Sequence, residues 1–407
     1  MGIVVKKYGG TSVGSPERIK KVAEQIIKAK GKEPQIVVVV SAMGDTTDEL
    51  IKLAHEITQF PDEREMDMLL STGEQISCAL LSIALISMGC PAVSLTAQQV
   101  EILTTNAYTK AKIQKVSTDR ILKELDAGKV VVVAGFQGIT EDQNITTLGR
   151  GGSDTTAVAL AAALDADICE IFTDVAGVYT TDPRIVPEAR KLELIAYEEM
   201  LELASAGAKV LQARSVEMAK KFGVKIHVRS SFNDLPGTIV CEEVANMEDI
   251  LVSGVTSHLD EAKITVSNVP NKPGMAAKIF SVLSEKNINV DMIVQSASTT
   301  GETNNISFTV TNTDLAKSVQ IMEEVSNEIG AGGVISDNNV AKVSIVGVGM
   351  RSHCGIASKM FSVLASKGIN IDMISTSEIK VSCIIKRNQA EEAVKALHEA
   401  FDLAKKS

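Results

Sequence analysis

The sequence has no tryptophan, only 3% aromatic residues, six cysteines and five histidines among its 407 residues. So few aromatic side chains disfavour a module that binds nucleic acid by base stacking. The cysteines are scattered without a CxxC pair, and no Cys/His cluster has the spacing of zinc ligands. We therefore expect reduced thiols and no metal site built by protein side chains alone.

Two further absences concern membranes and charge. No uninterrupted apolar run reaches the roughly 18–20 residues needed to cross a bilayer, and no secretion signal opens the sequence. The net charge of −10 argues against nucleic acid and anionic membranes, which both bind basic surfaces. We therefore expect a cytoplasmic protein. Its length and its 45% hydrophobic content indicate two or three globular domains.

The first half of the chain alternates short β-branched runs with helical patterns. The expected strands are 3–5, 36–40, 130–134 and 168–173, and the expected helices are 16–29, 65–88 and 153–164. Continuous β-branched runs are typical of strands buried on both faces. The alternation predicts a largely parallel sheet with helices on both faces. Ligands of such sheets bind beyond the carboxyl ends of the strands, so the residues that follow each strand are the candidate site.

Two glycine-rich segments have the features of anion sites. The run 7–10 (Lys-Tyr-Gly-Gly) ends the first strand, and its adjacent glycines let the backbone approach phosphate oxygens. Lys7 would bring a positive charge to a transferring phosphoryl group. In 147–156, three glycines surround Arg150 directly before an alanine-rich helix. Amides at a helix start bind anions, and an arginine can bind a carboxylate with two hydrogen bonds.

Other segments add weaker signals. Hydroxyl and small residues in 41–47 follow the second buried strand and suit either a polar ligand or a turn. Glu74 could pair with an ammonium group or act as a helix-capping acid. The run 173–184 offers an aromatic ring, hydroxyls, carboxylates and an arginine, which suit the edge of a nucleotide site. Lys209 is a glycine-flanked cation that could also be a solvated helix charge.

The last third of the chain repeats itself. Residues 276–283 recur as 357–364, and residues 288–293 recur as 369–374 with the same spacing. Each copy predicts a βαββαβ unit. A duplication without any ligand is the alternative interpretation. The acidic stretch 242–249 before the repeats has the composition of a linker.

Seven segments, in this order, resemble the aspartate kinase family within the wider amino-acid kinase fold: KYGGTSVGS, VVSAMGDTTDEL, STGEQIS, VAGFQGIT, TLGRGGSDTTA, FTDVAGVYTTDPR and GAKVL. The resemblance covers essentially the whole chain. It implies an α/β fold with a mostly parallel sheet sandwiched by helices, followed by two βαββαβ ferredoxin-like units of the ACT type. The implied domains are a catalytic domain at 1–245, a linker and entry segment at 246–262, and ACT domains at 263–335 and 336–407.

The resemblance also implies the roles of individual residues in ATP-dependent phosphorylation of the β-carboxylate of L-aspartate. ATP with Mg²⁺, the metal held mainly through the phosphates, would lie near Lys7, Tyr8, Gly9, Gly10, Ser41, Thr173, Asp174, Tyr179, Arg184 and Lys209. Of these, Lys7, Asp174 and Lys209 would be catalytic. Aspartate would lie near Thr47, Glu74, Phe136, Arg150, Gly151, Gly152, Ser153 and Asp154. Arg150 would bind its α-carboxylate, and Glu74 and Asp154 suit its ammonium group.

ACT domains in this family bind lysine, threonine or both, at interfaces between paired chains. The matching residues here are Asn271, Gly274, Met275, Ala276, Gln295, Asn370, Ile371, Thr376 and Ser377. Asn271 stands where relatives inhibited by lysine and threonine together often have an acid, and 352–355 lacks the proline of the first copy. The effector therefore stays open. We expect a dimer or a larger homo-oligomer, and an additional shorter chain starting near Met247, as in some relatives, stays open too.

Two rival functions would also use parts of this sequence. The same fold could phosphorylate acetylglutamate, glutamate or a nucleoside monophosphate, but acetylglutamate and nucleotides lack the free ammonium group that Glu74 could pair with. A catalytically silent amino-acid sensor would need only the repeats, which leaves the phosphate-loop residues unexplained. Because the sequence ends at Ser407, we expect no fused homoserine dehydrogenase region.

Overall fold

The computed structural model describes the chain except residues 1, 33–34, 209, 243–250, 298–300 and 406–407. The chain forms two compact units, which we describe separately. Unit 1 comprises Met1–Val178, Lys191–Ala204 and Lys209–Ala245. Unit 2 comprises Tyr179–Arg190, Ser205–Ala208 and Asn246–Ser407.

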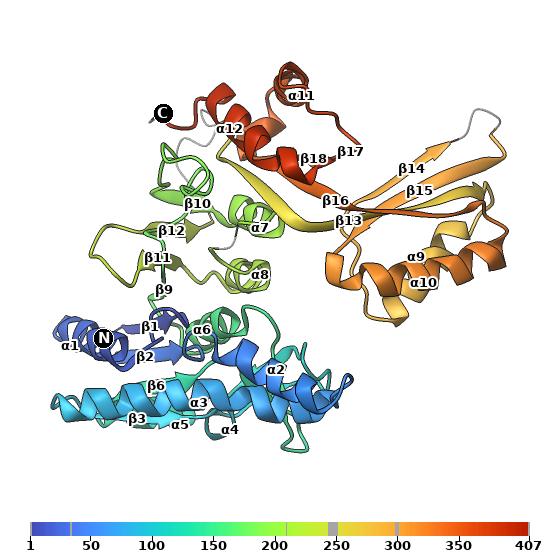
Figure 1. Ribbon diagram of the computed structural model, residues 1–407. Helices are drawn as coiled ribbons and strands as arrows, with labels where there is room; N and C mark the ends of the chain where they lie inside the picture. Colours follow the sequence, from blue (N-terminus) through green and yellow to red (C-terminus); the bar gives the residue numbers. More distant parts are fainter. Residues whose placement is uncertain (1, 33–34, 209, 243–250, 298–300, 406–407) are drawn as a thin grey trace. The chain divides into compact units, whose positions relative to one another are not determined.

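Unit 1 is built on an eight-stranded sheet of order β10-β12-β11-β9-β1-β2-β6-β3 (Figure 1). Its strands are β1 (Ile3–Tyr8), β2 (Gln35–Val40), β3 (Ala92–Leu95), β6 (Val130–Ala134), β9 (Ile168–Thr173), β10 (Leu194–Ala196), β11 (Ile226–Ser230) and β12 (Thr238–Cys241). All neighbouring pairs are parallel except β11 and β12. The four strands expected from β-branched runs are confirmed, and they are the adjacent strands β9, β1, β2 and β6.

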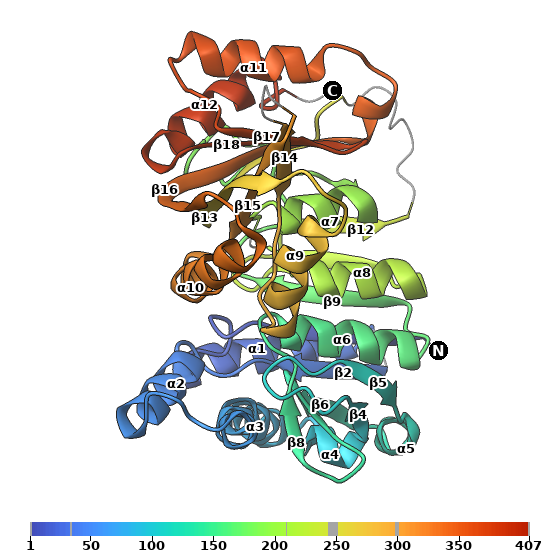
Figure 2. The ribbon, with the colours of Figure 1, turned by 90° about the vertical axis from the view of Figure 1, so that its right-hand side faces the viewer.

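Helices cover both faces of this sheet, as the alternation predicts. The helices of unit 1 are α1 (Pro16–Lys30), α2 (Thr46–Ile57), α3 (Glu63–Ser87), α4 (Ala97–Val100), α5 (Asp119–Asp126), α6 (Gly152–Ala163), α7 (Tyr197–Ser205) and α8 (Ala213–Phe222). On one face, Val38 of β2 packs in one core with Val22 of α1 and Leu81 of α3. On the other face, α6 packs against β1 and β2, with α8 beside it (Figure 2). Burial from both sides explains the uninterrupted valines of β2.

Helix α3 is a core helix although its composition resembles that of a membrane span. By length and composition alone it could cross a membrane, with a mean hydropathy of 1.6 over its most apolar window. However, 56% of that window is buried inside the protein, and the helix also buries Asp67 and Glu74. Such burial is what a helix in the centre of a domain requires.

A second, four-stranded sheet of unit 1 was not predicted. Its order is β5-β4-β7-β8, with β4 (Ile102–Thr104), β5 (Ile113–Val116), β7 (Gln137–Ile139) and β8 (Ile145–Thr147). Asp67 of α3 holds this region, because its carboxylate accepts hydrogen bonds from the amide of Thr109 at 2.9 Å and from the amide and hydroxyl of Thr147 at 2.8 and 2.6 Å. Burial raises the pKa of Asp67, and these hydrogen bonds oppose the rise.

Unit 2 contains a six-stranded antiparallel sheet of order β14-β15-β13-β16-β18-β17. Its strands are β13 (Gly254–Pro270), β14 (Ile293–Ala297), β15 (Thr303–Val310), β16 (Gly333–Val346), β17 (Met373–Thr376) and β18 (Lys380–Lys386). Its helices are α9 (Met275–Glu285), α10 (Asn312–Ile329), α11 (Ile356–Ser366) and α12 (Ala390–Ala400), with 3-10 helices at Val348–Arg351 and Arg387–Gln389.

The two repeats share the long central strands β13 and β16. The first part of β13 pairs with the second half of β16 from Gly254 to His258, and the second part of β13 pairs with β15. The second repeat therefore takes its last strand from residues 254–258, not from residues after α12 as the βαββαβ prediction had it. Residues 254–262, which fall in the predicted linker and entry segment 246–262, are the start of β13. Val255 is buried there in one core with Leu397 of α12, which favours this arrangement.

A buried ionic cluster joins three neighbouring strands of unit 1. Glu170 of β9 accepts hydrogen bonds from Lys6 of β1 and, at 2.9 Å, from Arg229 of β11. Its side chain is only 6% exposed. Burial alone would raise the pKa of Glu170, but His227, Lys6 and Arg229 lower it to about 2. The stabilisation from this pKa shift is complete above the ordinary pKa of a glutamate and is lost as the pH falls toward 2.

Replacement of this carboxylate should destabilise unit 1 strongly. Glu170→Ala leaves buried cations without their shared partner, so we expect an unfolding temperature lower by roughly 5–15 °C in calorimetry at pH 7. Asp234→Ala is the matched control, because it removes an ion pair to Lys28 in which both side chains are more than 75% exposed. The control should shift the temperature by about 1 °C or less. Equal shifts in the two variants would contradict the structural role of Glu170.

Candidate functional site

The candidate site begins where four parallel strands of unit 1 end. The amide of Ser41, directly after β2, donates to the carbonyl of Tyr8 at the end of β1. The amide of Gly135, directly after β6, donates in the same way to Val40. Both distances are 3.1 Å. The loops that follow β1, β2 and β6 therefore start side by side, as predicted for a parallel sheet.

The loop after β1 approaches the loop after β2 so closely that a side chain would not fit. A Cβ atom at Gly10 would lie 2.8 Å from the carbonyl oxygen of Ala42. The carbonyl of Gly10 also accepts a hydrogen bond from the amide of Gly44 at 3.1 Å. At Gly9 a Cβ would lie 3.6 Å from the ammonium nitrogen of Lys7. The glycine pair thus leaves backbone and a lysine charge together at the sheet edge, which suits an anion.

An ion pair joins β1 to the helix on the other side of the site. Alternation along β1 turns Lys7 toward α6, whereas Lys6 and Tyr8 point to the opposite face. The Nζ atom of Lys7 lies 2.6 Å from Oδ1 of Asp154, and the two side chains are 12% and 9% exposed. Asp154 is in the first turn of α6, where the helix dipole favours a carboxylate. The predicted cation thus has a carboxylate partner, and that partner is Asp154.

Glu74 brings a second carboxylate to the site from α3. Its side chain is nearly buried, and its Oε1 accepts a hydrogen bond from the amide of Ala42 at 3.1 Å. Its other oxygen, Oε2, has no hydrogen-bond partner in the described part of the chain. Burial raises the pKa of Glu74 to about 7, against the opposing effects of backbone amides and of the charge on Lys7. A buried acceptor without a donor is unfavourable, so this oxygen suits a proton or a cationic ligand.

The predicted glycine loop runs directly into α6. Gly149 and Gly151 adopt left-handed φ angles of 76° and 68°, which favour glycine. A Cβ at Gly152 would lie 2.7 Å from the ring of Phe136, so these two predicted residues are in close contact. Arg150 lies between Gly149 and Gly151, and its side chain is exposed. The loop therefore presents Arg150 outward at the start of a buried helix.

Two side chains that sequence reasoning missed help to hold this region. Arg214 of α8 donates to the carbonyl oxygens of Leu148 and Ala111, both at 2.7 Å. Asp67 holds β8, which leads into the glycine loop. No sequence motif contains Arg214 or Asp67, because each binds backbone groups that are distant in the sequence. The available signals were the position of Arg214 near the start of a helix and the presence of the Asp67 carboxylate in an apolar helix.

The remaining predicted residues are less tightly grouped. Ser153, close to Gly135, is buried, and Thr47 is half-buried in the first turn of α2. Thr173 donates from its hydroxyl to Asp174, whose side chain is exposed. Tyr179 and Arg184 belong to unit 2, where Arg184 pairs with Asp182 at 2.7 Å. Lys209 lies outside the described residues.

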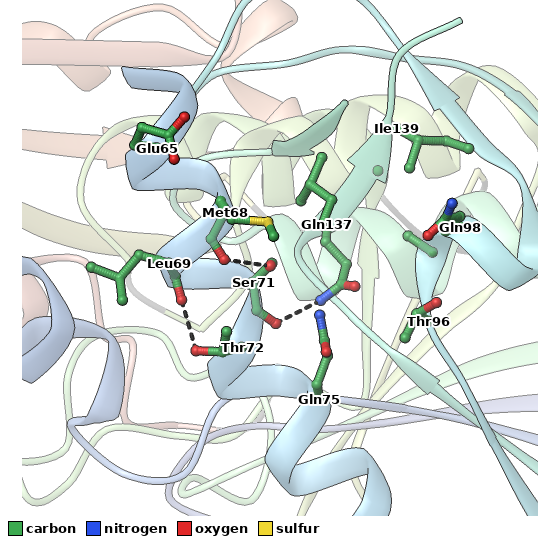
Figure 3. A pocket seen from close by; sticks show the side chains of 13 residues that line it. Glu65, Met68, Leu69, Ser71, Thr72, Gln75, Thr96, Gln98, Gln137 and Ile139 are labelled. Carbon is green, nitrogen blue, oxygen red and sulfur yellow. Dashed lines mark hydrogen bonds between the residues drawn. The ribbon is translucent and has the colours of Figure 1, made fainter. Parts of the chain in front are cut away.

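A cavity of about 530 Å³ opens on another face of α3 (Figure 3). Its walls come from Glu65, Met68, Leu69, Ser71, Thr72, Gln75, Thr96, Ala97, Gln98, Gln137, Gly138, Ile139 and Ile145. Gln137 closes one side by donating to the carbonyl of Ser71 at 2.9 Å. None of the predicted site residues lines this cavity, since Glu74 points instead toward Ala42.

The predicted effector residues lie on loops, on the edge strands β14 and β17 and in the first turn of α9 in unit 2. Asn271, Gly274, Ala276, Gln295, Asn370, Thr376 and Ser377 are exposed, and Met275 and Ile371 are half-buried. Asn271 is held by Gly301 and Asn304 through hydrogen bonds of 3.0 Å. Whether these residues bind an effector stays a prediction.

The two repeats exchange ion pairs beside these loops. Asp291 of the first repeat pairs with Lys342, and the equivalent Asp372 of the second repeat pairs with Lys263 at 3.3 Å. Lys342 is buried and also lies 3.0 Å from Glu261. Each repeat thus supplies the lysine for the other repeat's aspartate. This reciprocity fixes the repeats as one body rather than two independent units.

Comparisons with known proteins agree with this architecture. Residues 2–230 match the amino acid kinase family, and residues 264–325 and 343–401 match the ACT domain. The chain is 54% identical over 404 residues to an aspartate kinase of Stutzerimonas stutzeri, covering 99% of this chain and 98% of that protein. It is also 54% identical over 405 residues to the aspartokinase of Pseudomonas aeruginosa, with the same coverage.

Solved structures give the same result. The chain matches E. coli aspartokinase III in complex with aspartate and ADP with a TM-score of 0.84 and 26% identity, covering 98% and 99% of the two chains. It matches aspartate kinase from Synechocystis with a TM-score of 0.56 and 47% identity, covering 98% and 69%. The chain is therefore a phosphotransferase of the amino acid kinase family. Within that family it belongs to the aspartate kinases with C-terminal ACT domains, which confirms the predicted fold class and family.

The unpaired oxygen of Glu74 leads us to predict that this side chain affects KM for aspartate. Glu74→Gln keeps the shape but removes the charge, so KM for aspartate at pH 8 should rise roughly tenfold or more. In the unaltered enzyme KM for aspartate should fall between pH 6 and pH 8, because Glu74 ionises near pH 7. Initial rates across that pH range test both points, with the exposed Glu24→Gln as control. A variant with unchanged KM and the same pH dependence would contradict the role of Glu74.

Proposed function

We propose that the protein transfers the γ-phosphoryl group of ATP to the β-carboxylate of L-aspartate. A β-carboxylate oxygen forms the new bond to phosphorus, the bond to the bridging oxygen breaks, and 4-phospho-L-aspartate and ADP leave. This would be the first step toward lysine, threonine and methionine. The observation that carries the proposal is the meeting of Lys7, Asp154 and Glu74 at one sheet edge. Support comes from E. coli aspartokinase III, solved with aspartate and ADP.

The proposed reaction needs positioning more than acid–base chemistry. The β-carboxylate of aspartate is ionised at neutral pH, so no general base is required. Lys7 and the amides of Gly9 and Gly10 would face the transferring phosphoryl group and stabilise its negative charge. Asp154 orients Lys7, as their 2.6 Å separation indicates.

Recognition of aspartate would use charges of both signs. Arg150, exposed at the start of α6, would bind the α-carboxylate with two hydrogen bonds. Glu74 and Asp154 would receive the ammonium group, and Thr47, Phe136, Gly151, Gly152 and Ser153 would complete the pocket. An acceptor without an ammonium group would leave the buried oxygen of Glu74 unpaired, which disfavours acetylglutamate and nucleoside monophosphates.

The nucleotide would lie on the loops after β1, β2 and β9, near Tyr8, Ser41, Thr173 and Asp174, with Tyr179, Arg184 and Lys209. No group of three His, Cys, Asp or Glu side chains in the described ranges could by itself hold a metal ion. We expect Mg²⁺ to be held mainly through the phosphates, whose charge it would neutralise when bound. Lys209 would help to neutralise the nucleotide, and Asp174 would hold the cations of the site in place.

We also propose feedback regulation by lysine, threonine or both, through the ACT domains. E. coli aspartokinase III has been solved with lysine and aspartate. In this chain the ligand would contact Asn271, Gly274, Met275, Ala276, Gln295, Asn370, Ile371, Thr376 and Ser377. Because effectors in this family bind between paired chains, the protein would be a homo-oligomer. We propose a cytoplasmic location as well.

ADP release with ATP and Mg²⁺ tests the substrate assignment. L-Aspartate is compared with acetylglutamate, glutamate and UMP, and lysine and threonine are added singly and together. The proposal expects turnover with aspartate alone and suppression by those amino acids. Turnover with another acceptor instead of aspartate would overturn the assignment and, with it, the roles of Glu74 and Arg150.

Lys7 provides the most direct catalytic prediction. Lys7→Met removes a preorganised charge from the reacting centre, so kcat should fall by about 100-fold or more. The exposed Lys20→Met on α1 is the matched control and should keep normal kcat. Steady-state rates at saturating ATP and aspartate give kcat for both variants and for the unaltered enzyme. A Lys7→Met enzyme with normal kcat would remove Lys7 from the mechanism.

A further inference from the structure

Two short segments between strands of unit 1 belong to unit 2. They are Tyr179–Arg190 and Ser205–Ala208. The first contains Tyr179 and Arg184, which we propose contact the nucleotide. The second directly precedes Lys209, proposed for the same role. Residues of β13 and α12 in unit 2 hold these two segments.

The first segment is fastened by Thr180. Its carbonyl accepts a hydrogen bond from the amide of Val255 in β13 at 2.8 Å. Its hydroxyl accepts one from the amide of Arg190 at 3.0 Å and forms a further hydrogen bond, also of 3.0 Å, with Nε2 of His398. Thr180 and His398 are both buried, and burial lowers the pKa of His398, which favours the neutral ring. Thr180, the residue after Tyr179, is therefore held by hydrogen bonds to Val255, Arg190 and His398.

Apolar packing strengthens the same attachment. Val186, two residues after Arg184, is buried in the core that also contains Val255 of β13 and Leu397 of α12. Ile185 packs against this core. α12 lies against β13 in unit 2 (Figure 1). Arg184 thus stands on a turn whose following residues are anchored in the core of the second repeat.

The second segment is held by the next residues of the same strand. The hydroxyl of Thr256 donates to the carbonyl of Ala206 at 3.3 Å. At Gly207, with φ of 111°, a Cβ would lie 2.7 Å from the carbonyl oxygen of Ser257. The backbone two residues before Lys209 therefore rests directly on β13. Val255, Thr256 and Ser257 are consecutive, so one short stretch of strand supports both segments.

We propose that Val255–Ser257, together with His398, form a ledge that positions the nucleotide-binding segments for phosphoryl transfer. These residues act through Thr180, Ala206 and Gly207 and need not touch ATP themselves. The inference rests on the proposed function, because that function places the nucleotide near Tyr179, Arg184 and Lys209. By this inference, residues of the ACT repeats support ATP binding even when no effector is bound.

The test removes the two anchoring hydroxyls while keeping side-chain shape. Thr180→Val and Thr256→Val should each raise the Kd for ADP and KM for ATP roughly three- to tenfold, the scale of one lost hydrogen bond. KM for aspartate should stay within about twofold, since its residues lie in unit 1. Thr309→Val in β15 is the control: Thr309 is equally buried and its hydroxyl accepts from the amide of Met292, far along the chain from the ledge. Thr256→Ser, which keeps the hydroxyl, should restore ADP binding.

The outcomes separate this inference from the proposed function. If the unaltered enzyme phosphorylates aspartate but both ledge variants bind ADP normally, or if all three Thr→Val variants weaken ADP binding equally, the ledge is overturned. If the unaltered enzyme binds ADP but does not phosphorylate aspartate, the proposed function fails, while selective weakening in the ledge variants still supports the ledge. Should one ledge variant not fold, the other decides.

Discussion

The contact between Lys7 and Asp154 depends on a single constraint, the alternation of side chains along parallel strands. In β1 that alternation turns Lys7 toward α6 and turns Lys6 and Tyr8 to the opposite face, where Lys6 pairs with Glu170 and Tyr8 packs in one core with residues of α1 and α3. Because β1, β2, β6 and β9 are parallel neighbours, their loops start at one edge, and α6 places its first turn against the same edge. A shift of β1 by one residue would turn Lys7 away from Asp154 and turn Lys6 away from Glu170.

Beside this ion pair lies a buried carboxylate that is only partly paired. Glu74 is buried with one oxygen unpaired, and its pKa is raised to about 7. In a low-dielectric setting an unmet charge or hydrogen bond interacts strongly with a complementary ligand. The same burial that makes an unpaired oxygen of Glu74 costly would make it selective for a ligand carrying an ammonium group. On the opposite face, Glu170 is fully paired and has a strongly lowered pKa, as expected of a structural carboxylate.

The sequence predicted those parts of the fold that local patterns determine. The runs 36–40, 130–134 and 168–173 became buried strands of one sheet, and the glycine loop around Arg150 runs into α6 as expected. Sequence could not predict the strands of three or four residues in the small sheet, because they carry no extended apolar run. Nor could it assign Asp154 to Lys7, since that pair depends on strand order, or show that residues 254–258 complete the second repeat. These features follow from topology, and the effector residues remain predictions because loops carry little structural signal.

The most direct test of this account is the proton linkage of aspartate binding. Calorimetric titration of L-aspartate at pH 7, in buffers with different ionisation enthalpies, counts the protons released. If the ammonium group binds Glu74, whose pKa is about 7 before binding, roughly half a proton should leave per aspartate bound. The release should disappear in Glu74→Gln. Binding without proton release, or with the same release in the variant, would contradict the claim that this buried carboxylate receives the substrate.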